Sequence, residues 1–201
     1  NYNLAKVKKK IAVVGAGPAG ISAASIAAQR GHDVTLFDAD SEIGGQFNIA
    51  KQIPGKEEFY ETIRYFKKQL ELHKVTQKLN TRVSSEDLLK GNFDEVVLAT
   101  GIKPRMPKIE GIENKKVLNY LDVLKHKKPV GKRVAVIGAG GIGFDVSEYL
   151  AHEGESTSQN IDAWLKEWGI DKSLSARSGI EGIQPEIDPS PREIFMLKRS
   201  K

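Results

Sequence analysis

The stretch IAVVGAGPAGISA, residues 11–23, constrains the fold of this 201-residue chain more than any other feature. Its apolar start predicts a buried strand over residues 9–14, and the small residues after the glycine turn predict a helix over residues 18–30. A second apolar stretch, DVTLFD at residues 33–38, follows directly. Strand, helix and strand in about 30 residues predict a right-handed βαβ unit with parallel strands.

The turn GAGPAG follows the pattern G-x-G-x-x-G, with Gly15, Gly17 and Gly20 at its three glycine places. The first glycine permits the tight turn, the second lets a diphosphate approach the backbone, and the third lets the helix pack closely on the strand. The diphosphate lies at the positive end of the helix. Asp38 ends the second strand, where a carboxylate can accept hydrogen bonds from ribose hydroxyls. We predict a dinucleotide site; the alternative is a structural βαβ unit with an incidental glycine turn.

The same pattern recurs in AVIGAGGIGFD, residues 135–145. A second strand is expected at residues 194–197, followed by the basic residues Lys198, Arg199 and Lys201. An acid at this place would repel a 2′-phosphate, whereas Lys and Arg can pair with one. We predict that the second site takes NADP(H) rather than NAD(H); the alternative is basic residues that merely end an exposed strand. Two such sites fit a flavin that stays bound and a nicotinamide that delivers hydride to it.

Composition excludes several classes of function. The chain has no cysteine and only four scattered histidines, so we expect no disulfide, iron–sulfur cluster or metal site within it. Its net charge is +5, but the basic residues are spread among 26 acidic ones without interleaved aromatic residues, so we expect no nucleic-acid partner. The apolar run at residues 11–14 is too short for a signal peptide or a membrane span, which predicts a cytoplasmic protein without membrane contact.

The remaining elements complete an α/β chain. We expect a helix over residues 55–73, and Pro54 and Gly55 fit its start. We also expect a strand over residues 93–99 that is buried on both faces. Further expected elements are an extended segment at 75–83, a short helix at 118–124, a strand at 133–137 and helices at 142–151 and 161–168. Trp164 and Trp168 are expected to pack against the parent domain.

These elements predict a Rossmann-like three-layer FAD/NAD(P)-binding fold with two consecutive dinucleotide-binding units, the second incomplete. We place the FAD-binding domain at residues 1–129. The start of the NADP(H)-binding domain is placed at residues 130–201, with a polar insertion at about 153–192 between its helix and its second strand.

Several stretches resemble the bacterial NADPH-dependent 2,4-dienoyl-CoA reductases, which are old-yellow-enzyme-like flavoproteins with an appended FAD/NAD(P) module. The stretch GGQFNIAKQIPGKEEF, within residues 34–66, is far more specific than a glycine turn. The resemblance extends through VLATGIKPRMPKIEGI at 97–112, VLNYLDVL at 117–124 and GESTSQNI at 154–161, and covers nearly the whole chain from about residue 8.

The resemblance implies a larger enzyme with an N-terminal barrel that holds FMN, the acyl-CoA substrate and the catalytic side chains, followed by a 4Fe–4S cluster. Electrons would pass from NADPH to FAD, then through the cluster to FMN and the dienoyl-CoA, a step in the β-oxidation of unsaturated fatty acids. The resemblance further implies a C-terminal segment that closes both nucleotide-binding domains, which we do not find in this sequence. We therefore expect an interior fragment that binds dinucleotides, contains no catalytic residue and is inactive alone.

The resemblance also implies site residues. The expected FAD contacts are Gly15, Ala16, Gly17, Pro18, Ala19, Gly20, Asp38, Gly45, Gln46, Lys56, Val83 (through its backbone to adenine), Ala99, Thr100 and Gly101. The expected NADP(H) contacts are Gly138, Gly140, Gly141, Ile142, Gly143, Lys198 and Arg199. For Lys56 the alternative is an ordinary surface lysine at a helix start, and for Gln46 a loop cap.

Two other functions remain open. One is a different member of the same assembly, such as an amine dehydrogenase or an enoate reductase, which would differ in the substrate of the barrel. The other is a non-catalytic nucleotide-binding module, such as a redox sensor or scaffold. A thioredoxin-reductase-like enzyme is excluded because it needs a cysteine pair, and the chain has no cysteine.

Overall fold

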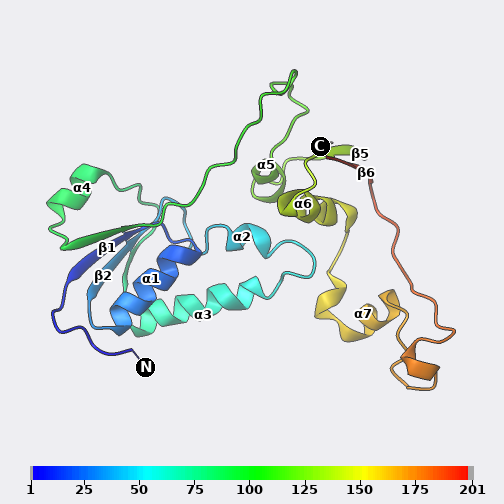
Figure 1. Cartoon of the computed structure of the whole chain (residues 1–201), viewed down its shortest axis with the longest axis horizontal. Helices are drawn as coiled ribbons and strands as arrows, with labels where there is room; N and C mark the ends of the chain where they lie inside the picture. The colour runs from blue at the N-terminus through cyan, green and yellow to red at the C-terminus, as the bar shows by residue number, and fades with distance from the viewer. Residues whose placement is uncertain (1, 199–201) are drawn as a thin grey trace. The chain divides into compact units, whose positions relative to one another are not determined.

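The predicted βαβ unit is present at the start of the chain. In the computed structural model, which describes residues 2–198, its two strands are parallel and place Val14 opposite Phe37. The small side chains that were expected in the helix allow it to pack closely, since Gly20, Ala24 and Ser25 are buried against the sheet side of the unit. The elements are β1 (Lys10–Val14), α1 (Pro18–Gln29) and β2 (Asp33–Phe37) (Figure 1).

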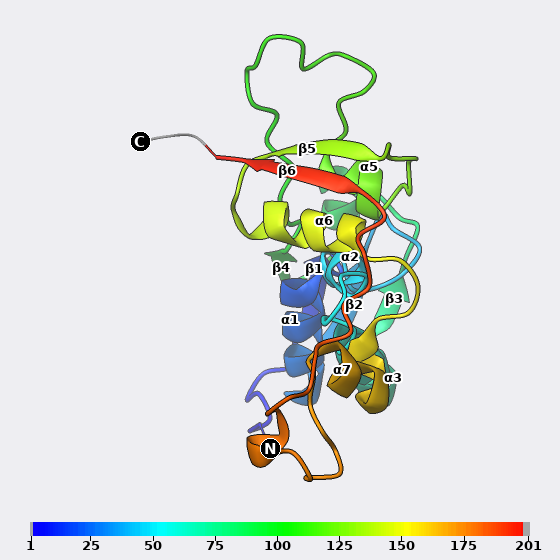
Figure 2. The same ribbon diagram turned by 90° about the vertical axis from the view of Figure 1, so that its right-hand side faces the viewer.

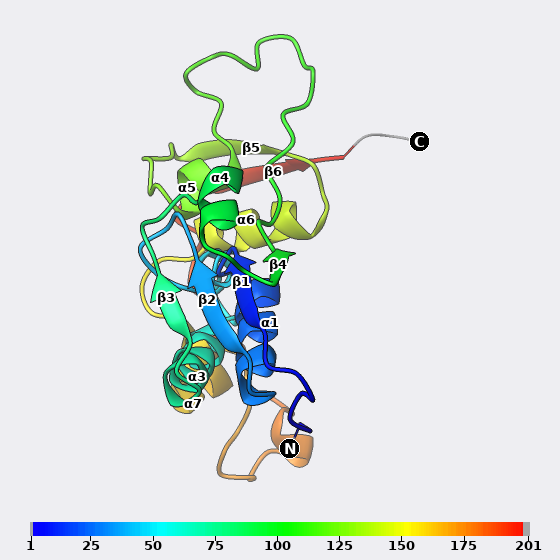
Figure 3. The same ribbon diagram turned by 90° about the vertical axis from the view of Figure 1, so that its left-hand side faces the viewer.

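Two further strands extend this unit to a four-stranded parallel sheet in the order β3-β2-β1-β4 (Figure 3). The added elements are α3 (Phe59–Leu72), β3 (Thr76–Lys78) and β4 (Glu95–Leu98). Helices α1 and α3 contact each other and bury one apolar core with the strands. The buried core residues are Ile11, Val13, Ala16, Ile21, Ala24, Val34, Leu36, Ile43, Leu70 and Val75.

The prediction that the strand at residues 93–99 is buried on both faces is wrong. β4 is exposed along its whole length, and Leu98 keeps 73% of its surface. The reason is its place in the sheet, because β4 pairs only with β1 and forms the edge of the sheet in the described part of the chain. The apolar residues of the strand predict that it can be buried, but they do not tell whether another element covers it.

The helix expected from residue 55 begins four residues later, at Phe59. Gly55 has φ +82°, in the left-handed region, so the backbone cannot continue there as a right-handed helix. The extended segment expected at 75–83 forms a strand over only three residues, and Asn80 with φ +52° follows it. Two short helices were not expected: α2 (Phe47–Ala50) and α4 (Ser85–Lys90).

The second glycine turn also joins a strand to a helix, and the strand and helix predictions there are confirmed. β5 and β6 are parallel neighbours with Ile137 opposite Leu197, and α6 packs on one face of the pair through the buried Val146 and Leu150 (Figure 2). The opposite face, which includes Phe195, is exposed. The elements are α5 (Tyr120–Leu124), β5 (Arg133–Ile137), α6 (Gly141–Ala151) and β6 (Glu193–Leu197).

Between α6 and β6 the chain forms short helical turns and loops. The regular elements are a 3₁₀ turn at Thr157–Gln159, α7 (Ile161–Glu167) and a second 3₁₀ turn at Arg177–Gly179. Trp164 and Trp168 do not pack into the domain as expected: they keep 38% and 61% of their surface, and their rings lie 5.9 Å apart. Indole surface is therefore exposed on α7 at Trp164 and directly after α7 at Trp168.

Contacts within the chain define two units. The first contains the residues up to Ala50 and Glu58–Pro107, and the second contains Lys51–Glu57 and the residues from Lys108 onward. The short segment Lys51–Glu57 therefore belongs to the second unit although the helices on either side of it, α2 and α3, belong to the first. The predicted domain limits, 1–129 and 130–201, stay a prediction.

Candidate functional site: two dinucleotide-binding turns

The first glycine turn has a geometry that only glycine provides. The Gly15 N–H donates to the carbonyl oxygen of Phe37 at 2.8 Å, and Gly15 has φ +105°. A Cβ on Gly20 would overlap the carbonyl oxygen of Gly15, so the third glycine lets α1 pack against the turn. The Ile21 N–H donates to the Gly17 carbonyl at 3.0 Å, while the N–H groups that precede it in α1 have no intrahelical acceptor. These groups can hold a diphosphate.

A second loop approaches this turn. The Gly44 N–H donates to the carbonyl of Ala16 at 2.8 Å, and a Cβ on Gly45 would lie 2.8 Å from the Gly17 Cα. Two backbones therefore meet here without side chains between them. Gln46 follows at the start of α2 with an exposed side chain, so it is free of the core. This arrangement places the predicted Gly45 at the first glycine turn, and Gln46 is the next residue in the sequence.

Asp38 braces the turn, a role that the sequence did not reveal. Its carboxylate accepts the N–H of Ala16 at 2.5 Å and the N–H of Asp40 at 2.8 Å. An ionised carboxylate has about four lone-pair positions, so it can still accept a ribose hydroxyl. The carbonyl oxygen of Asp38 accepts the Thr81 N–H at 2.7 Å, which brings the chain after β3 to the same place.

The end of β4 closes the other side. The Ala99 N–H donates to the Val14 carbonyl at 2.8 Å, and a Cβ on Gly15 would overlap the Ala99 carbonyl oxygen. Thr100 and Gly101 come next in the sequence, and both are exposed. The structure thus brings eight of the predicted contacts into one cluster: Gly15, Ala16, Gly17, Pro18, Gly20, Asp38, Gly45 and Ala99.

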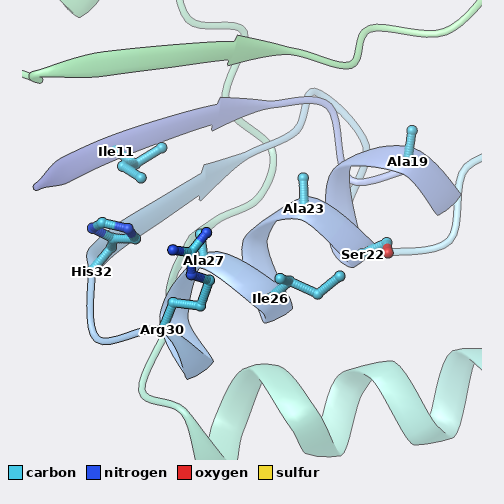
Figure 4. Close-up of a pocket in the computed structure, with 8 residues that line it drawn as sticks. All are labelled: Ile11, Ala19, Ser22, Ala23, Ile26, Ala27, Arg30 and His32. Carbon is cyan, nitrogen blue, oxygen red and sulfur yellow. The ribbon is translucent and has the colours of Figure 1, made fainter. Parts of the chain in front are cut away.

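Three predicted contacts lie differently. Val83 is half-buried in the irregular chain between β3 and α4, two residues after Thr81. Ala19 is exposed and lines a cavity of about 500 Å³ along α1, together with Ile26, Arg30 and His32 (Figure 4). Lys56 lies in the second unit, where its ammonium pairs with Asp145 at 2.6 Å.

The second glycine turn repeats the first in detail. The Gly138 N–H donates to the Leu197 carbonyl at 2.8 Å, and Gly138 has φ +116°. A Cβ on Gly143 would overlap the Gly138 carbonyl oxygen, as Gly20 would overlap Gly15. The residue before each helix has the same extended ψ, −178° at Gly17 and −177° at Gly140. Gly141 and Ile142 begin α6 and are exposed.

The matching hydrogen bonds identify the residue that takes the place of Asp38. Phe37 and Leu197 each accept the N–H of the first glycine, and the next residues are Asp38 and Lys198. The second unit therefore carries an exposed cation where the first carries a carboxylate. The predicted contact Arg199 lies outside the described residues.

The described residues were also compared with the requirements of a metal site and of a membrane-spanning helix. Residues 2–198 contain no group of three or more His, Asp or Glu side chains that could hold a metal ion. Within the same described range, no helix combines the length and the apolar character needed to cross a membrane. The cluster at each turn consists of backbone N–H groups and single charges, which suits an anionic dinucleotide.

Comparison with known proteins agrees with this geometry. The family model described as pyridine nucleotide-disulphide oxidoreductase matches residues 9–167 and so spans both glycine turns. The chain belongs to the pyridine nucleotide-disulphide oxidoreductase family. Its fold is the FAD/NAD(P)-binding Rossmann-like α/β fold, as the sequence predicted.

Relatives with known functions show where this family domain occurs. The chain is 39% identical over 181 residues to an NADH oxidase of Thermoanaerobacter brockii, covering 86% of this chain and 27% of the relative. It is 39% identical over 148 residues to bilirubin reductase of Mediterraneibacter gnavus, covering 73% and 23%. The chain therefore spans about a quarter of the length of these relatives.

A solved structure matches nearly the whole chain. It is 2-naphthoyl-CoA reductase in complex with 2-naphthoyl-CoA, with a TM-score of 0.72 and 31% identity, and the match covers 98% of this chain and 34% of that one. The similarity includes the polar stretch between α6 and β6, because so little of the chain is left out. The match to this structure therefore includes residues of both units.

Proposed function

We propose that this chain is the electron-input part of an old-yellow-enzyme-like flavin oxidoreductase and, more finely, of a cytoplasmic NADPH-dependent 2,4-dienoyl-CoA reductase. The observation that carries the proposal is the repeated turn, with the same hydrogen bonds at Gly15 and Gly138 but a carboxylate after one strand and a cation after the other. Two turns that share one geometry, with residues of opposite charge beside them, suit two different dinucleotides.

The first unit fits FAD. Gly17 and Gly45 leave a side-chain-free surface at the positive end of α1, where a diphosphate would be held by backbone N–H groups. Asp38 would accept the ribose hydroxyls of the adenosine. Gln46, Thr100 and Gly101 are exposed and follow residues of this cluster in the sequence, and Val83 remains a proposed contact.

The second unit fits a nicotinamide dinucleotide. Gly140, Gly141 and Ile142 present the start of α6 to a diphosphate, and no residue lies within 4 Å of a Cβ placed on Gly140 or Gly141. Lys198, with Arg199 after it, would pair with a 2′-phosphate, whereas a carboxylate at this place would repel it. NADP(H) is therefore the proposed ligand rather than NAD(H).

When bound, the two cofactors supply hydride transfer from a nicotinamide to a flavin. The chain's own residues bind and orient them: the glycine turns hold the diphosphates, and Asp38 and Lys198 select the adenosine ends. No side chain of this chain is proposed as a nucleophile or a general acid. Since the chain lacks cysteine, an iron–sulfur cluster, like FMN and the acyl-CoA site, would belong to protein outside these 201 residues.

Support for an acyl-CoA substrate comes from the stretch GGQFNIAKQIPGKEEF and from the similarity to 2-naphthoyl-CoA reductase, whose solved structure holds a CoA thioester. A second candidate is another flavin oxidoreductase with the same module. It is favoured by the relatives at 39% identity, which are a bilirubin reductase and an NADH oxidase.

One experiment tests the electron-input role. The purified chain is mixed with FAD, freed of excess, and scanned for a bound-flavin absorbance spectrum; NADPH or NADH is then added without oxygen. We expect bound FAD whose absorbance is bleached faster by NADPH than by NADH. A chain that binds FAD but is not bleached by either nucleotide would be a nucleotide-binding module without this role. Faster bleaching by NADH would overturn the NADP(H) assignment.

A further inference from the structure

The segment Lys51–Glu57 is fastened to the second unit by several polar contacts. The Lys56 ammonium pairs with the Asp145 carboxylate at 2.6 Å, across 89 residues of sequence. The Ser158 hydroxyl donates to Glu57 at 2.8 Å, and Gln52 accepts a hydrogen bond from Lys127. Ile53 in the same segment is buried. These contacts explain why the segment belongs to this unit rather than to that of its sequence neighbours.

Asp145 lies close to the second glycine turn. It is four residues after Gly141, the first residue of α6, so it lies about 6 Å further along the helix and on nearly the same face. Because Cα–Cβ bonds tilt toward the start of a helix, its carboxylate is displaced back toward the turn. An unpaired carboxylate at this place would repel a diphosphate bound there.

Lys56 removes that repulsion. Its side chain keeps 41% of its surface and that of Asp145 keeps 31%, so the pair is half-buried and only partly screened by solvent. With Asp145 neutralised by Lys56, no net negative charge opposes the positive end of α6, and this end stays available to an anion. A lysine thus contributes to the anion-binding character of a turn that it does not belong to.

Glu57 holds the lysine in place. Partial burial acts to raise the pKa of its carboxyl, but hydrogen bonds from Ser156, Ser158 and backbone N–H groups outweigh burial and keep the pKa below its ordinary value. Glu57 is therefore ionised at neutral pH and remains an acceptor for the two serines. The segment carries Lys56 next to this anchored residue, which limits where its long side chain can reach.

We propose that Lys56 is a positioning residue for the nicotinamide dinucleotide, acting by neutralising Asp145 beside the diphosphate-binding turn. This inference rests on the proposed function, and it gives Lys56 a role different from the flavin contact expected from the sequence. The two roles can be separated by experiment. Replacing a flavin contact would weaken FAD binding, whereas replacing a neutralising residue would weaken NADPH binding.

The test measures the dissociation constant of NADPH by nucleotide fluorescence, and the bound FAD by absorbance, in the whole 201-residue chain. The variants are Lys56→Met, Lys56→Arg, Asp145→Asn and the double variant Lys56→Met with Asp145→Asn. Lys67→Met is the matched control, because Lys67 is an exposed lysine on α3. Thermal unfolding without nucleotide is recorded for each variant, and binding is measured at low and high salt.

We expect Lys56→Met to weaken NADPH binding about fivefold at low salt and less at high salt, without loss of FAD. Lys56→Arg and the control should bind as the wild type does, and the double variant should return to within about twofold of it, because the charge to be neutralised is gone. Asp145→Asn alone should bind at least as tightly as the wild type. A merely structural role would lower the unfolding temperature without this dependence on charge.

Three results would overturn the inference. The first is equal NADPH binding by Lys56→Met and the control while the wild type binds normally. The second is loss of FAD from Lys56→Met with unchanged NADPH binding, which would make Lys56 a flavin contact. The third is weaker NADPH binding by Asp145→Asn alone, a result that holds even where Lys56→Met does not fold. A wild-type chain that binds no NADPH would refute the proposed function and this inference together.

Discussion

Asp38 and Lys198 occupy the same position in two copies of one structural unit. Each directly follows the strand residue, Phe37 or Leu197, whose carbonyl accepts the N–H of the first glycine of the turn at 2.8 Å. The backbones therefore agree while the charges are opposite. Since the adenosine ends of FAD and NADP(H) differ by a 2′-phosphate, this one position distinguishes the two sites chemically.

The first prediction concerns Lys198. Replacing Lys198 by Ala should weaken NADPH binding about fivefold and leave NADH binding unchanged, because only NADPH carries the 2′-phosphate and an exposed ion pair contributes about 1 kcal/mol. Titration of each nucleotide by fluorescence measures the ratio. Lys67→Ala, on α3, removes an exposed lysine elsewhere and should change neither constant. Equal weakening of both nucleotides would contradict the proposed selectivity.

The second prediction separates folding from binding within one turn. A Cβ on Gly17 would lie 3.9 Å from the Gly45 Cα, an ordinary contact, whereas a Cβ on Gly20 would overlap the Gly15 carbonyl oxygen. Gly17→Ala should therefore keep its free energy of unfolding and bind FAD much less tightly, since the methyl group occupies the approach of the diphosphate. Gly20→Ala should lose about 2 kcal/mol or more of unfolding free energy because backbone atoms cannot move aside cheaply.

Urea unfolding and FAD titration measure the two effects, and Gly131→Ala is the control. A Cβ on Gly131 would meet nothing within 4 Å, and its φ is not positive, so neither stability nor FAD binding should change. If Gly17→Ala binds FAD as the wild type does, the diphosphate does not lie at this turn.

The glycine turns could be read from the sequence because their geometry demands glycine. A positive φ at Gly15 and the overlap at Gly20 and Gly143 leave no other residue type that fits without strain, so the pattern itself predicts the backbone. The strands beside the turns were found from their continuous apolar runs, which are typical of parallel strands. β1 and β2 are largely buried, whereas one face of β5 and β6 is exposed. The helix α4 was missed although Ser84 and Asp87 form a capping box, a signal present in the sequence.

Other features depend on contacts between distant residues and leave no local pattern. The bond from the Ala16 N–H to Asp38 joins residues 22 apart, and the Lys56–Asp145 pair joins residues 89 apart. The exposure of β4 depends on which elements cover it and not on its own apolar residues. For these reasons the glycines of the two turns were predictable, whereas the bracing role of Asp38 and the partner of Lys56 were not.

The third prediction tests the bracing role of Asp38. Asp38→Ala removes the acceptor of two backbone N–H groups, those of Ala16 and Asp40, and should lower the free energy of unfolding by about 1–3 kcal/mol even without FAD. Asp38→Asn keeps one acceptor oxygen and should lose less. Urea unfolding of the FAD-free chain measures both. Asp33→Ala, at the other end of β2, is the control; if it costs as much stability, the effect belongs to the strand and not to the turn.

The last prediction concerns Asp171, which organises the loop before the second 3₁₀ turn. Its carboxylate accepts hydrogen bonds from the hydroxyls of Ser173 and Ser175 and from the N–H groups of Ser173 and Ala176, and these bonds hold its pKa far below the ordinary range. A carboxyl whose pKa is lowered by folding stabilises the folded loop above its unfolded pKa of about 4, and this stabilisation is lost as the pH falls through the lower folded value.

The loop should therefore stay ordered from neutral pH to about pH 4 and open only in stronger acid, because protonation of Asp171 removes the negative charge that its four hydrogen bonds stabilise and turns one oxygen into a donor. Asp171→Asn should open it already at pH 7. Trypsin cleavage after Arg177, which lies in the 3₁₀ turn, measures this at neutral pH, and amide exchange corrected for its intrinsic pH dependence follows the acid range. Asp188→Asn is the comparison, since Asp188 is exposed in the stretch between this turn and β6. Cleavage of Asp171→Asn at the wild-type rate would show that the four hydrogen bonds do not order the loop.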